Sequence, residues 1–259
     1  MPKPINHTLA ARRHSAESAD LRRDMAACFR IIDVLGWSEH IFNHVTVRIP
    51  GDPKHVLVNP FGVLYSEMRA SALVRMSLLE SGAHTDSPDI SPAAPALHGG
   101  IHRSRPDVAA VIHTHSTAGV AVACDYDGLN RNNVYAAQIV DDVAYHEFGG
   151  LTVDAAESDR IAASLGEHHL LILRNHGLVA VGASIQEALF RMFTLQRACE
   201  VQLAARAGGR LVRPIKDDVI ATTGRQFGQL LAFDGWNAPH VFFEALRRRV
   251  DRLDPTYRQ

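Results

Sequence analysis

Two spacings of apolar residues run through the chain and predict helices interleaved with strands. From about Ala16 to Leu35 the apolar positions recur every three to four residues, the period of an amphipathic helix, and Gly36 ends it. Further helices are predicted at residues 96–104, 117–124, 155–165, 185–207 and 239–253. We expect residues 1–15 to form a flexible arm, residues 65–74 to be irregular or a short helix, and residues 81–95 to be a loop.

Short alternating or continuous apolar runs predict the strands. They lie at residues 42–49, 55–59, 108–115, 139–145, 170–174 and 178–181. Turn sequences, Pro50-Gly51-Asp52-Pro53 and Asn175-His176-Gly177, separate consecutive strands. Because short turns join antiparallel neighbours, we expect a mixed or mainly antiparallel sheet covered by helices, in one domain over residues 16–259.

Composition narrows the class of protein. Apolar residues make up 46% and charged residues 21%, and the formal charge is −1, as in a soluble globular protein. This balance argues against nucleic acid or a membrane surface as the partner, since both require a basic surface. No apolar run approaches the roughly 20 residues of a membrane span, and no signal peptide is recognisable. Cys28, Cys124 and Cys199 indicate reduced core thiols, so we expect a cytoplasmic protein.

Histidine is the one residue type whose number stands out, at 15. The sharpest histidine motif is Val111-Ile112-His113-Thr114-His115. In a strand, residues i and i+2 point to the same face with Cα atoms about 6–7 Å apart. Two imidazoles at that spacing can converge on one metal ion. The alternative is a pair of polar histidines at the end of a strand.

A second motif places a histidine in a turn between two buried strands. In Leu173-Arg174-Asn175-His176-Gly177-Leu178 the glycine allows close approach of the backbone. Taken alone, the motif favours the alternative that His176 is a turn residue bonded to a nearby carbonyl. With His113 and His115 it forms a set of three ligands that leaves coordination positions open for water and substrate, which is typical of catalytic metal sites.

Other polar residues are candidates to complete a site. His98 and His102 lie four apart on the helix before the His113 strand, either as a surface pair or as support for metal ligands. Glu67 is a candidate acid/base or a helix cap. Tyr145 is a candidate acid/base or a core residue. Arg174 is a candidate for binding a substrate carboxylate or a solvated structural residue.

Several short motifs follow one another in a fixed order. They are Leu35-Gly36-Trp37, Phe42-Asn43-His44-Val45-Thr46, Asn59-Pro60-Phe61-Gly62-Val63-Leu64-Tyr65-Ser66-Glu67, Leu97-His98, Arg105-Pro106-Asp107-Val108, His113-Thr114-His115, Val143-Ala144-Tyr145-His146 and Leu173-Arg174-Asn175-His176-Gly177-Leu178. Together they resemble the class II aldolase/adducin family over residues 20–210. The pattern is nearer to the adducin-like branch than to the sugar-phosphate aldolases.

The resemblance implies an α/β fold of three layers, αβα, around a central, mainly antiparallel sheet. It implies one divalent metal per subunit (Zn, Mn or Fe) held by His113, His115 and His176, and homotetramers with active sites near subunit interfaces. Family enzymes cleave carbon–carbon bonds by polarising a carbonyl or hydroxyl pair on the metal, which stabilises an enolate. Some relatives instead decarboxylate aromatic hydroxy-acids, dehydrate or epimerise sugar phosphates, or use iron with oxygen.

One departure from the aldolase pattern concerns proton transfer. The aldolases carry an acid/base Glu four residues before the histidine that corresponds to His98, and this chain has Ala94 there. The resemblance then leaves proton transfer to His44, His98, His102, Tyr145 or Glu67. Alternatively, the site is catalytically silent, as a resemblance to adducin allows.

A second departure concerns phosphate. The paired serines that bind phosphate in the aldolases fall on Pro92 and Ala93, their Thr-Gly loop falls on Phe61-Gly62, and an Asn of their Gly-Asn turn falls on His44. A phosphate group gains most from charge-assisted hydrogen bonds. We therefore expect a substrate that is not a sugar phosphate. The residues expected to bind it are Phe61, Gly62, Pro95, His102 and Arg174, of which Phe61 and Pro95 suit an apolar or aromatic molecule.

These observations predict a divalent-metal-dependent carbon–carbon lyase, a decarboxylase or an aldolase, that acts on a non-phosphorylated hydroxy- or oxo-acid through a metal-stabilised enolate. Decarboxylation needs an electron sink and one proton delivered to carbon, a smaller demand than aldol cleavage makes of its acid/base. Two alternatives stay open. One is a non-haem iron oxygenase on the same scaffold, since three neutral ligands also accept Fe²⁺. The other is a non-catalytic, adducin-like assembly module.

Overall fold

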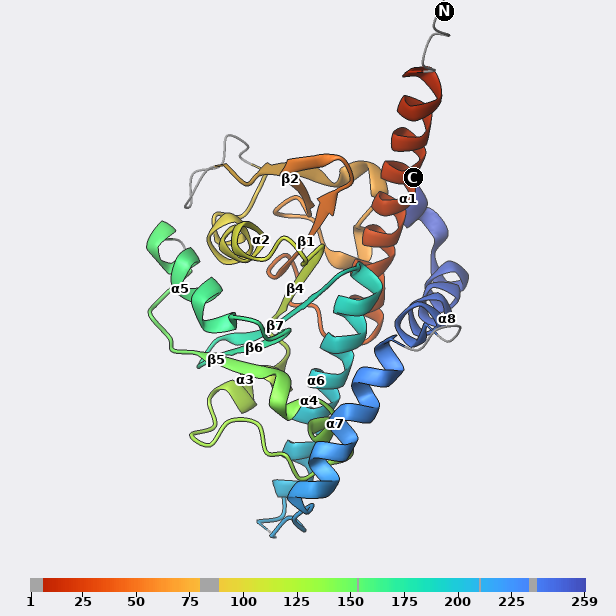
Figure 1. Cartoon of the computed structure of the whole chain (residues 1–259). Coiled ribbons are helices and arrows are strands. Elements are labelled where there is room, and N and C mark those ends of the chain that lie inside the picture. Colours follow the sequence, from red (N-terminus) through yellow and green to blue (C-terminus); the bar gives the residue numbers. More distant parts are fainter. Residues whose placement is uncertain (1–6, 80–88, 153, 210, 233–236) are drawn as a thin grey trace, which may run out of the picture.

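The computed structural model describes residues 7–79, 89–152, 154–209, 211–232 and 237–259. Within these ranges, a seven-stranded sheet forms the centre of the molecule, with strand order β3-β2-β1-β4-β7-β6-β5 (Figure 1). Its strands are β1 (His44–Ile49), β2 (Asp52–Val58), β3 (Val74–Ser77), β4 (Ala110–Thr114), β5 (Val143–His146), β6 (Leu170–Leu173) and β7 (Gly177–Gly182). Neighbouring strands are antiparallel except β5 and β6, which are parallel.

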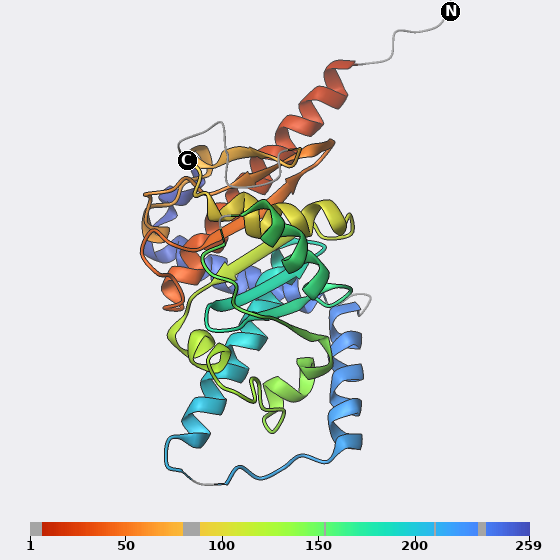
Figure 2. The same ribbon diagram turned by 90° about the vertical axis from the view of Figure 1, so that its left-hand side faces the viewer.

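Helices cover both faces of this sheet, as Figures 1 and 2 show. They are α1 (His7–Val34), α2 (Gly100–Ser104), α3 (Thr117–Ala123), α4 (Val134–Ile139), α5 (Ala155–Leu165), α6 (Ile185–Arg206), α7 (Asp217–Ala232) and α8 (Ala238–Leu253). A one-turn π-helix, η3 (Pro95–Gly99), leads directly into α2, and short 3₁₀ turns are η1 (Tyr65–Glu67), η2 (Ala70–Ala72), η4 (Val140–Asp142) and η5 (Pro255–Arg258). The expected three-layer αβα architecture with a mainly antiparallel sheet is confirmed.

The two-residue period of the strands assigns each side chain to one face. On β4, Ala110 and Ile112 join the large core formed with α1, α6 and α8, whereas Val111 joins the smaller cluster beneath α2 and α5. The same alternation on β1 places Val45 and Val47 in the large core. His44, Thr46 and His113 therefore face the side covered by η3 and α2, and this parity positions the site.

Most predicted elements agree with the observed ones, and the differences have local causes. α1 begins at His7, so residues 7–15 are helical where we expected a flexible arm, because Ala10, Ala11, Arg12 and Arg13 have high helix propensity. The sequence prediction missed β3, a four-residue edge strand, and α4, a six-residue helix whose start is capped by the Asn133 side chain. It also missed α7. Residues 1–6 of the expected arm and 81–88 of the expected loop lie outside the described residues.

One expectation about the cysteines was wrong. Cys28 and Cys199 are buried, but Cys124 is exposed. It directly follows the last residue of α3, where the chain turns into the loop that begins at Asp125. We therefore do not count Cys124 among the core thiols.

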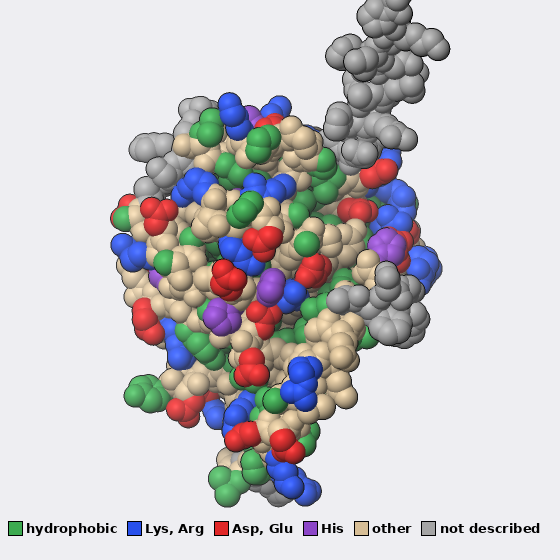
Figure 3. All heavy atoms as spheres, viewed as in Figure 1, with side chains coloured by type: hydrophobic (Ala, Val, Ile, Leu, Met, Phe, Trp, Pro, Cys, Tyr) green, Lys and Arg blue, Asp and Glu red, His purple; other side chains and the backbone are tan. Residues whose placement is uncertain are grey.

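The surface carries acidic and basic side chains interspersed on the face drawn in Figure 3. This distribution agrees with the balanced charge of the sequence. Among the described residues, no helix is both long and apolar enough to cross a bilayer.

Candidate metal centre and substrate pocket

Three histidines from two segments of the chain meet at the ends of neighbouring central strands. His113 lies on β4, His115 directly follows that strand, and His176 lies in the turn between β6 and β7. Their ligating nitrogens all lie within 4.8 Å of one another. The ring centroids are 4.6 Å apart for His113 and His115, 4.9 Å for His113 and His176, and 4.8 Å for His115 and His176. The structure thus brings together the three residues that the sequence motifs singled out.

The turn that carries His176 requires a glycine after it. Thr114 pairs with Leu178 across the β4–β7 ladder, so the start of β7 passes close to the end of β4. A Cβ atom on Gly177 would lie 2.5 Å from the Thr114 carbonyl oxygen and 3.0 Å from Cδ2 of His115. A side chain at this position would therefore push apart the two segments that hold the histidines.

The hydrogen bonds of His113 and His115 define their tautomers. Nδ1 of His113 donates to the Leu178 carbonyl at 2.9 Å, and Nδ1 of His115 donates to Oε2 of Glu39 at 2.6 Å. In neutral rings both Nε2 atoms are then unprotonated, and they face each other at 2.8 Å. Two lone pairs at that separation repel unless a cation lies between them. The two Nε2 atoms therefore fit a divalent metal. Nδ1 of His113 and Nδ1 of His115 each make a hydrogen bond, as is usual for histidines that bind a metal.

Burial favours the neutral form of His113 and His176, which is the form that binds metal. It lowers the pKa of His113 well below its usual range, and the neighbouring His115 and His176 lower it further. Burial likewise lowers the pKa of His176 to about 4, with smaller contributions from His115 and His146. A cation is thus favoured here over extra protons at neutral pH.

The loop between α1 and β1 supplies a residue that sequence reasoning missed. Glu39, which binds His115, is tied back to Phe42 by an isolated bridge, with the Phe42 amide donating to the Glu39 carbonyl at 2.9 Å. His40 and Asn43 in the same loop have positive φ angles of 51° and 71°. No periodicity or motif identifies Glu39 as a partner of His115, because the two are 76 residues apart and meet only through the fold.

A chain of buried side chains leads away from the metal centre on the η3 and α2 face. His44 on β1 lies opposite His113 on β4, and its Nδ1 atom is hydrogen-bonded to Nε2 of His98 at 2.7 Å. The Thr46 hydroxyl then joins His98 Nδ1 at 2.7 Å and His102 Nε2 at 2.8 Å. Burial lowers the pKa of His44 to about 3 and that of His98 well below its usual range, so these two rings are neutral.

This chain has two consistent proton arrangements. The Thr46 hydroxyl carries one proton, so it donates to one ring and accepts from the other. When it donates to His98, His98 donates to His44 Nδ1, and His44 Nε2 carries a proton. When the direction is reversed, His44 Nε2 is left as an acceptor. These hydrogen-bonded side chains can therefore present Nε2 of His44 as a proton donor or as a proton acceptor. Every ring is neutral in both arrangements.

A pocket of about 290 Å³ opens beside the three histidines. Its walls are mainly apolar, and the Phe42 and Phe61 rings lie 6.3 Å apart in it. The lining residues are Ile41, Phe42, Asn43, His44, Phe61, Ser91, Pro92, Ala93, Leu97, His113, His115, Leu151, Thr152 and His176. No Lys or Arg is among the described residues that line it. Phe61 and His44, two residues predicted from the sequence, thus lie at the pocket with the three histidines.

The remaining predicted residues lie outside the pocket lining. His98 and His102 belong to the buried chain behind it, Pro95 is buried at the start of η3, and Gly62 is exposed beside Phe61. Ala94, the position of the aldolase Glu, packs in an apolar cluster with Val56 and Val58. The pocket roles expected for these residues stay predictions.

Glu67, Tyr145 and Arg174 are engaged elsewhere. The Glu67 carboxylate is exposed and accepts a hydrogen bond from the Leu64 amide at 3.3 Å, as a cap. The Tyr145 hydroxyl accepts from the Leu129 amide at 3.0 Å. The Arg174 guanidinium lies 4.3 Å from the Tyr145 ring centroid and donates to the Asp125 carbonyl at 2.9 Å. These contacts agree with the structural alternatives expected for the three residues, while their catalytic or binding roles stay predictions.

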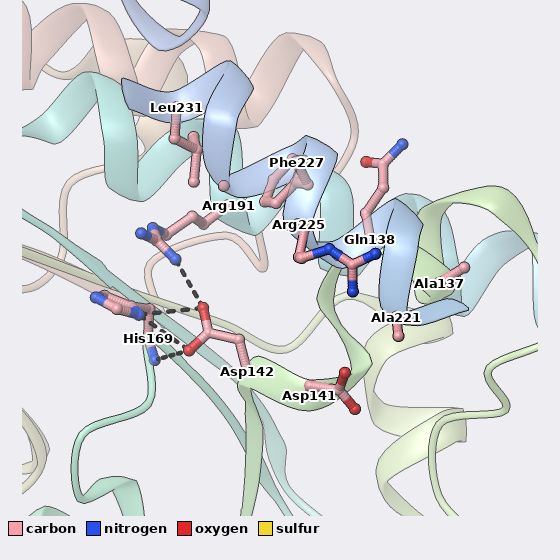
Figure 4. Close-up of a pocket in the computed structure, with 12 residues that line it drawn as sticks. Ala137, Gln138, Asp141, Asp142, His169, Arg191, Ala221, Arg225, Phe227 and Leu231 are labelled. Atoms are coloured by element: carbon pink, nitrogen blue, oxygen red, sulfur yellow. Dashed lines mark hydrogen bonds and ion pairs between the residues drawn. The ribbon is translucent and has the colours of Figure 1, made fainter. Parts of the chain in front are cut away.

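A larger pocket, of about 530 Å³, lies between α4, α6 and α7 and is shown in Figure 4. Arg191 and His169 both point at Asp142 in this view, at 2.7 Å and 2.9 Å. Arg191 also donates to Glu187 at 2.8 Å. These three charged side chains pair with one another, and among the described residues only His113, His115 and His176 form a converging set of possible metal ligands. The histidine site is therefore the better candidate despite its smaller volume.

Comparison with known proteins places the chain in a family. Residues 23–203 match the model of the class II aldolase and adducin N-terminal domain, and the chain belongs to that family. A Pseudomonas aeruginosa protein is 37% identical over 247 residues, covering 95% of this chain and 94% of that protein. Its name assigns it provisionally to the class 2 aldolases. Mouse alpha-adducin is 41% identical over 244 residues, covering 90% of this chain and 33% of the adducin.

Solved structures agree. An aldolase II superfamily protein from Pseudomonas syringae superposes with a TM-score of 0.84 at 33% identity, covering 93% of this chain and 96% of that one. An L-fuculose 1-phosphate aldolase from Glaciozyma antarctica superposes with a TM-score of 0.80 at 27% identity, covering 100% of this chain and 97% of that one. The family and fold are therefore established, and the scaffold is that of metal-dependent lyases.

Proposed function

We propose that this protein is a divalent-metal-dependent lyase that acts on a non-phosphorylated hydroxy- or oxo-acid, by decarboxylation or by aldol-type cleavage. The observation that carries the proposal is the approach of Nε2 of His113 and Nε2 of His115 to 2.8 Å, with His176 beside them. Their Nδ1 atoms are held by Leu178 and Glu39, which leaves the Nε2 atoms to a metal. When bound, the metal supplies a Lewis acid that polarises an oxygen of the substrate.

The chain's own side chains support a proton step beside the metal. His44 lines the pocket, and its Nε2 atom is a donor or an acceptor according to the direction of the hydrogen-bond chain through His98 and Thr46. Decarboxylation and aldol cleavage both need one proton moved at the reacting carbon or oxygen. In this proposal His44 takes the role that the aldolase pattern gives to a Glu, since Ala94 is apolar and packed away from the pocket.

The lining of the pocket supports a substrate without phosphate. Among the described lining residues there is no Lys or Arg, and Pro92, Ala93 and Phe61 occupy the positions that bind phosphate in the aldolase pattern. A phosphate there would lose its hydration without charge-assisted replacements. We therefore separate this protein's substrate from that named for the L-fuculose 1-phosphate aldolase, although the folds superpose.

The test begins with the metal. Protein purified without chelator is expected to contain about one divalent ion per chain, and His113→Ala is expected to contain none. Hydroxy- and oxo-acids, phosphorylated and not, are then assayed with Zn²⁺, Mn²⁺ and Fe²⁺ in the absence of oxygen. Anaerobic turnover of a non-phosphorylated acid supports a lyase, whereas turnover that requires oxygen and Fe²⁺ indicates an oxygenase. A native protein free of metal would end the proposal.

A non-catalytic assembly module is the second candidate, and the 41% identity to mouse alpha-adducin favours it. It predicts a stable homo-oligomer with no turnover of any acid, with or without metal. Sedimentation and activity measured on the same preparation separate the two functions. The homotetramer and the cytoplasmic location expected from the sequence stay predictions under either one.

A further inference from the structure

We propose that Gln196 is a positioning residue for the metal centre, which keeps the Glu39 carboxylate against the His115 ring. Gln196 lies on α6, which packs against β4 and β7, the two strands at whose ends the three histidines lie (Figure 1). Its side chain is 2% exposed and is not part of the pocket lining. It therefore acts on the site through other residues, and its role rests on the proposed function, in which the three histidines bind a metal.

The contact between Glu39 and His115 needs support from the rest of the fold. The Glu39 side chain is 47% exposed, and an exposed charged pair contributes little when its side chains must be ordered to form it. The same loop holds His40 and Asn43 in left-handed backbone conformations, which are unfavourable for residues other than glycine. Contacts that fix the loop in advance would remove much of this cost.

One such contact joins the loop to α6. Trp37, two residues before Glu39 and 4% exposed, donates from its indole nitrogen to Oε1 of Glu200 at 3.3 Å. Nε2 of Gln196, one helical turn away, donates to the same oxygen at 3.0 Å. Arg197 on the same helix binds the second oxygen of the Glu200 carboxylate. The loop is thus tied to a carboxylate whose own position is fixed from α6.

A second contact ties α6 to the segment that carries His115. Ser116, the next residue, caps α3, and its hydroxyl accepts a hydrogen bond from the Gly119 amide at 3.2 Å. The same hydroxyl donates its proton to Oε1 of Gln196. The two atoms of one buried amide therefore link both sides of the Glu39–His115 contact to a single helix.

An amide meets both demands at this position. The Glu200 carboxylate only accepts hydrogen bonds, so Nε2 of Gln196 faces Glu200 and Oε1 faces the Ser116 hydroxyl. A carboxylate in place of the amide would oppose that of Glu200. An apolar side chain would leave the Ser116 hydroxyl and the Glu200 carboxylate each without one partner, which is costly for buried groups.

The experiment is a double-mutant cycle on Zn²⁺ affinity, measured on the full chain by competition with a chromophoric chelator. Gln196→Met keeps a similar shape without the amide. It is expected to bind Zn²⁺ about 3- to 10-fold more weakly than the wild-type protein, the ratio that a hydrogen bond of ordinary net strength gives. In the Glu39→Ala background the same substitution should cause no further loss, because the contact that Gln196 supports is already absent.

Gln202→Met is the matched control. Gln202 is also buried on α6, and its amide donates to the Gly128 carbonyl at 2.9 Å, in the loop after α3. Both methionine variants are expected to unfold at lower urea concentrations, but only Gln196→Met should lose Zn²⁺ affinity. Trp37→Phe, which removes the indole donor to Glu200, repeats the test with a second variant and should show the same dependence on Glu39.

Three results would overturn the role of Gln196. They are unchanged Zn²⁺ affinity in Gln196→Met, an equal loss in Gln202→Met, and a loss that persists in the Glu39→Ala background. In each case the wild-type protein still binds Zn²⁺ and the proposed function stands. A wild-type protein that binds no Zn²⁺ would instead end the proposed function, and the role of Gln196 with it.

Discussion

The carboxylate of Glu39 lies 2.6 Å from Nδ1 of His115, and this contact joins the loop after α1 to the metal centre. It directs the Nε2 lone pair of His115 toward His113. The aldolase pattern places a carboxylate at the position of Ala94, on the helix that covers the site. This chain instead has a carboxylate one hydrogen bond away from the three histidines, where it orients the ring of His115.

Removing the Glu39 carboxylate should weaken metal binding. Glu39→Ala is expected to lower Zn²⁺ affinity about 10- to 100-fold, the usual effect of losing the partner of a ligating histidine. Glu39→Gln keeps an acceptor and loses the charge, so its affinity should fall in between. Competition with a chromophoric chelator measures the affinity. Glu67→Gln is the matched control, because that exposed carboxylate only caps the Leu64 amide, and equal affinities in all these variants would refute the role of Glu39.

Bound metal should stabilise the fold through all three histidines. Zn²⁺ at about 100 times its dissociation constant is expected to raise the free energy of unfolding by about 2.7 kcal/mol, because it binds only the folded chain. In His176→Ala the rise should be much smaller, since one of the three converging ligands is lost. Urea unfolding with and without Zn²⁺ measures both. An undiminished rise in His176→Ala would show that the third ring takes no part.

A methyl group at Gly177 should disrupt the site from within. In Gly177→Ala the new Cβ would lie 2.5 Å from the Thr114 carbonyl oxygen, a contact that the backbone must move to relieve. We expect a loss of about 1–3 kcal/mol in the free energy of unfolding, as for other overpacked sites, together with weaker Zn²⁺ binding. Urea unfolding and chelator competition give the two values.

The matched control is Gly228→Ala on α7, where a Cβ meets nothing within 4 Å. Alanine is favoured over glycine in a helix, so this variant should be about 0.5–1 kcal/mol more stable than the wild-type protein. Opposite signs for the two substitutions would confirm the crowding at Gly177. A neutral Gly177→Ala would contradict it.

The buried His102 should make stability depend on pH. Burial, and then the charge of Arg48, lowers its pKa to about 3, against about 6.5 in the unfolded chain. Between pH 4 and 6 the unfolded chain therefore binds a proton that the folded chain excludes, and stability falls as the pH falls. His102→Gln removes this proton uptake, so the free energy of unfolding should depend on pH less steeply, by about 1.4 kcal/mol per pH unit.

Urea unfolding of the metal-free protein in chelator at several pH values from 4 to 7 gives the two slopes. The metal is removed because its own binding depends on pH. Parallel curves for the wild-type protein and His102→Gln would mean that His102 takes up a proton in the folded state.

Local patterns were enough to predict much of the fold. The spacing of apolar residues predicted α5, α6 and α8 nearly to the residue, and the turn at Asn175-His176-Gly177 predicted the antiparallel pairing of β6 and β7. Short elements were missed. An edge strand such as β3 buries little apolar surface, so its pattern is weak, and α4 is too short to show a period.

By itself, the sequence predicted from the two-residue period of a strand that His113 and His115 converge; in the structure β4 ends at Thr114 and His115 directly follows it, with the two rings 4.6 Å apart. The sequence also determined that His176 occupies a glycine turn. The tertiary structure decided that these segments meet and that Glu39 orients His115. Those relationships join residues far apart along the chain, and only the packing of helices on both faces of the sheet brings such residues within bonding distance.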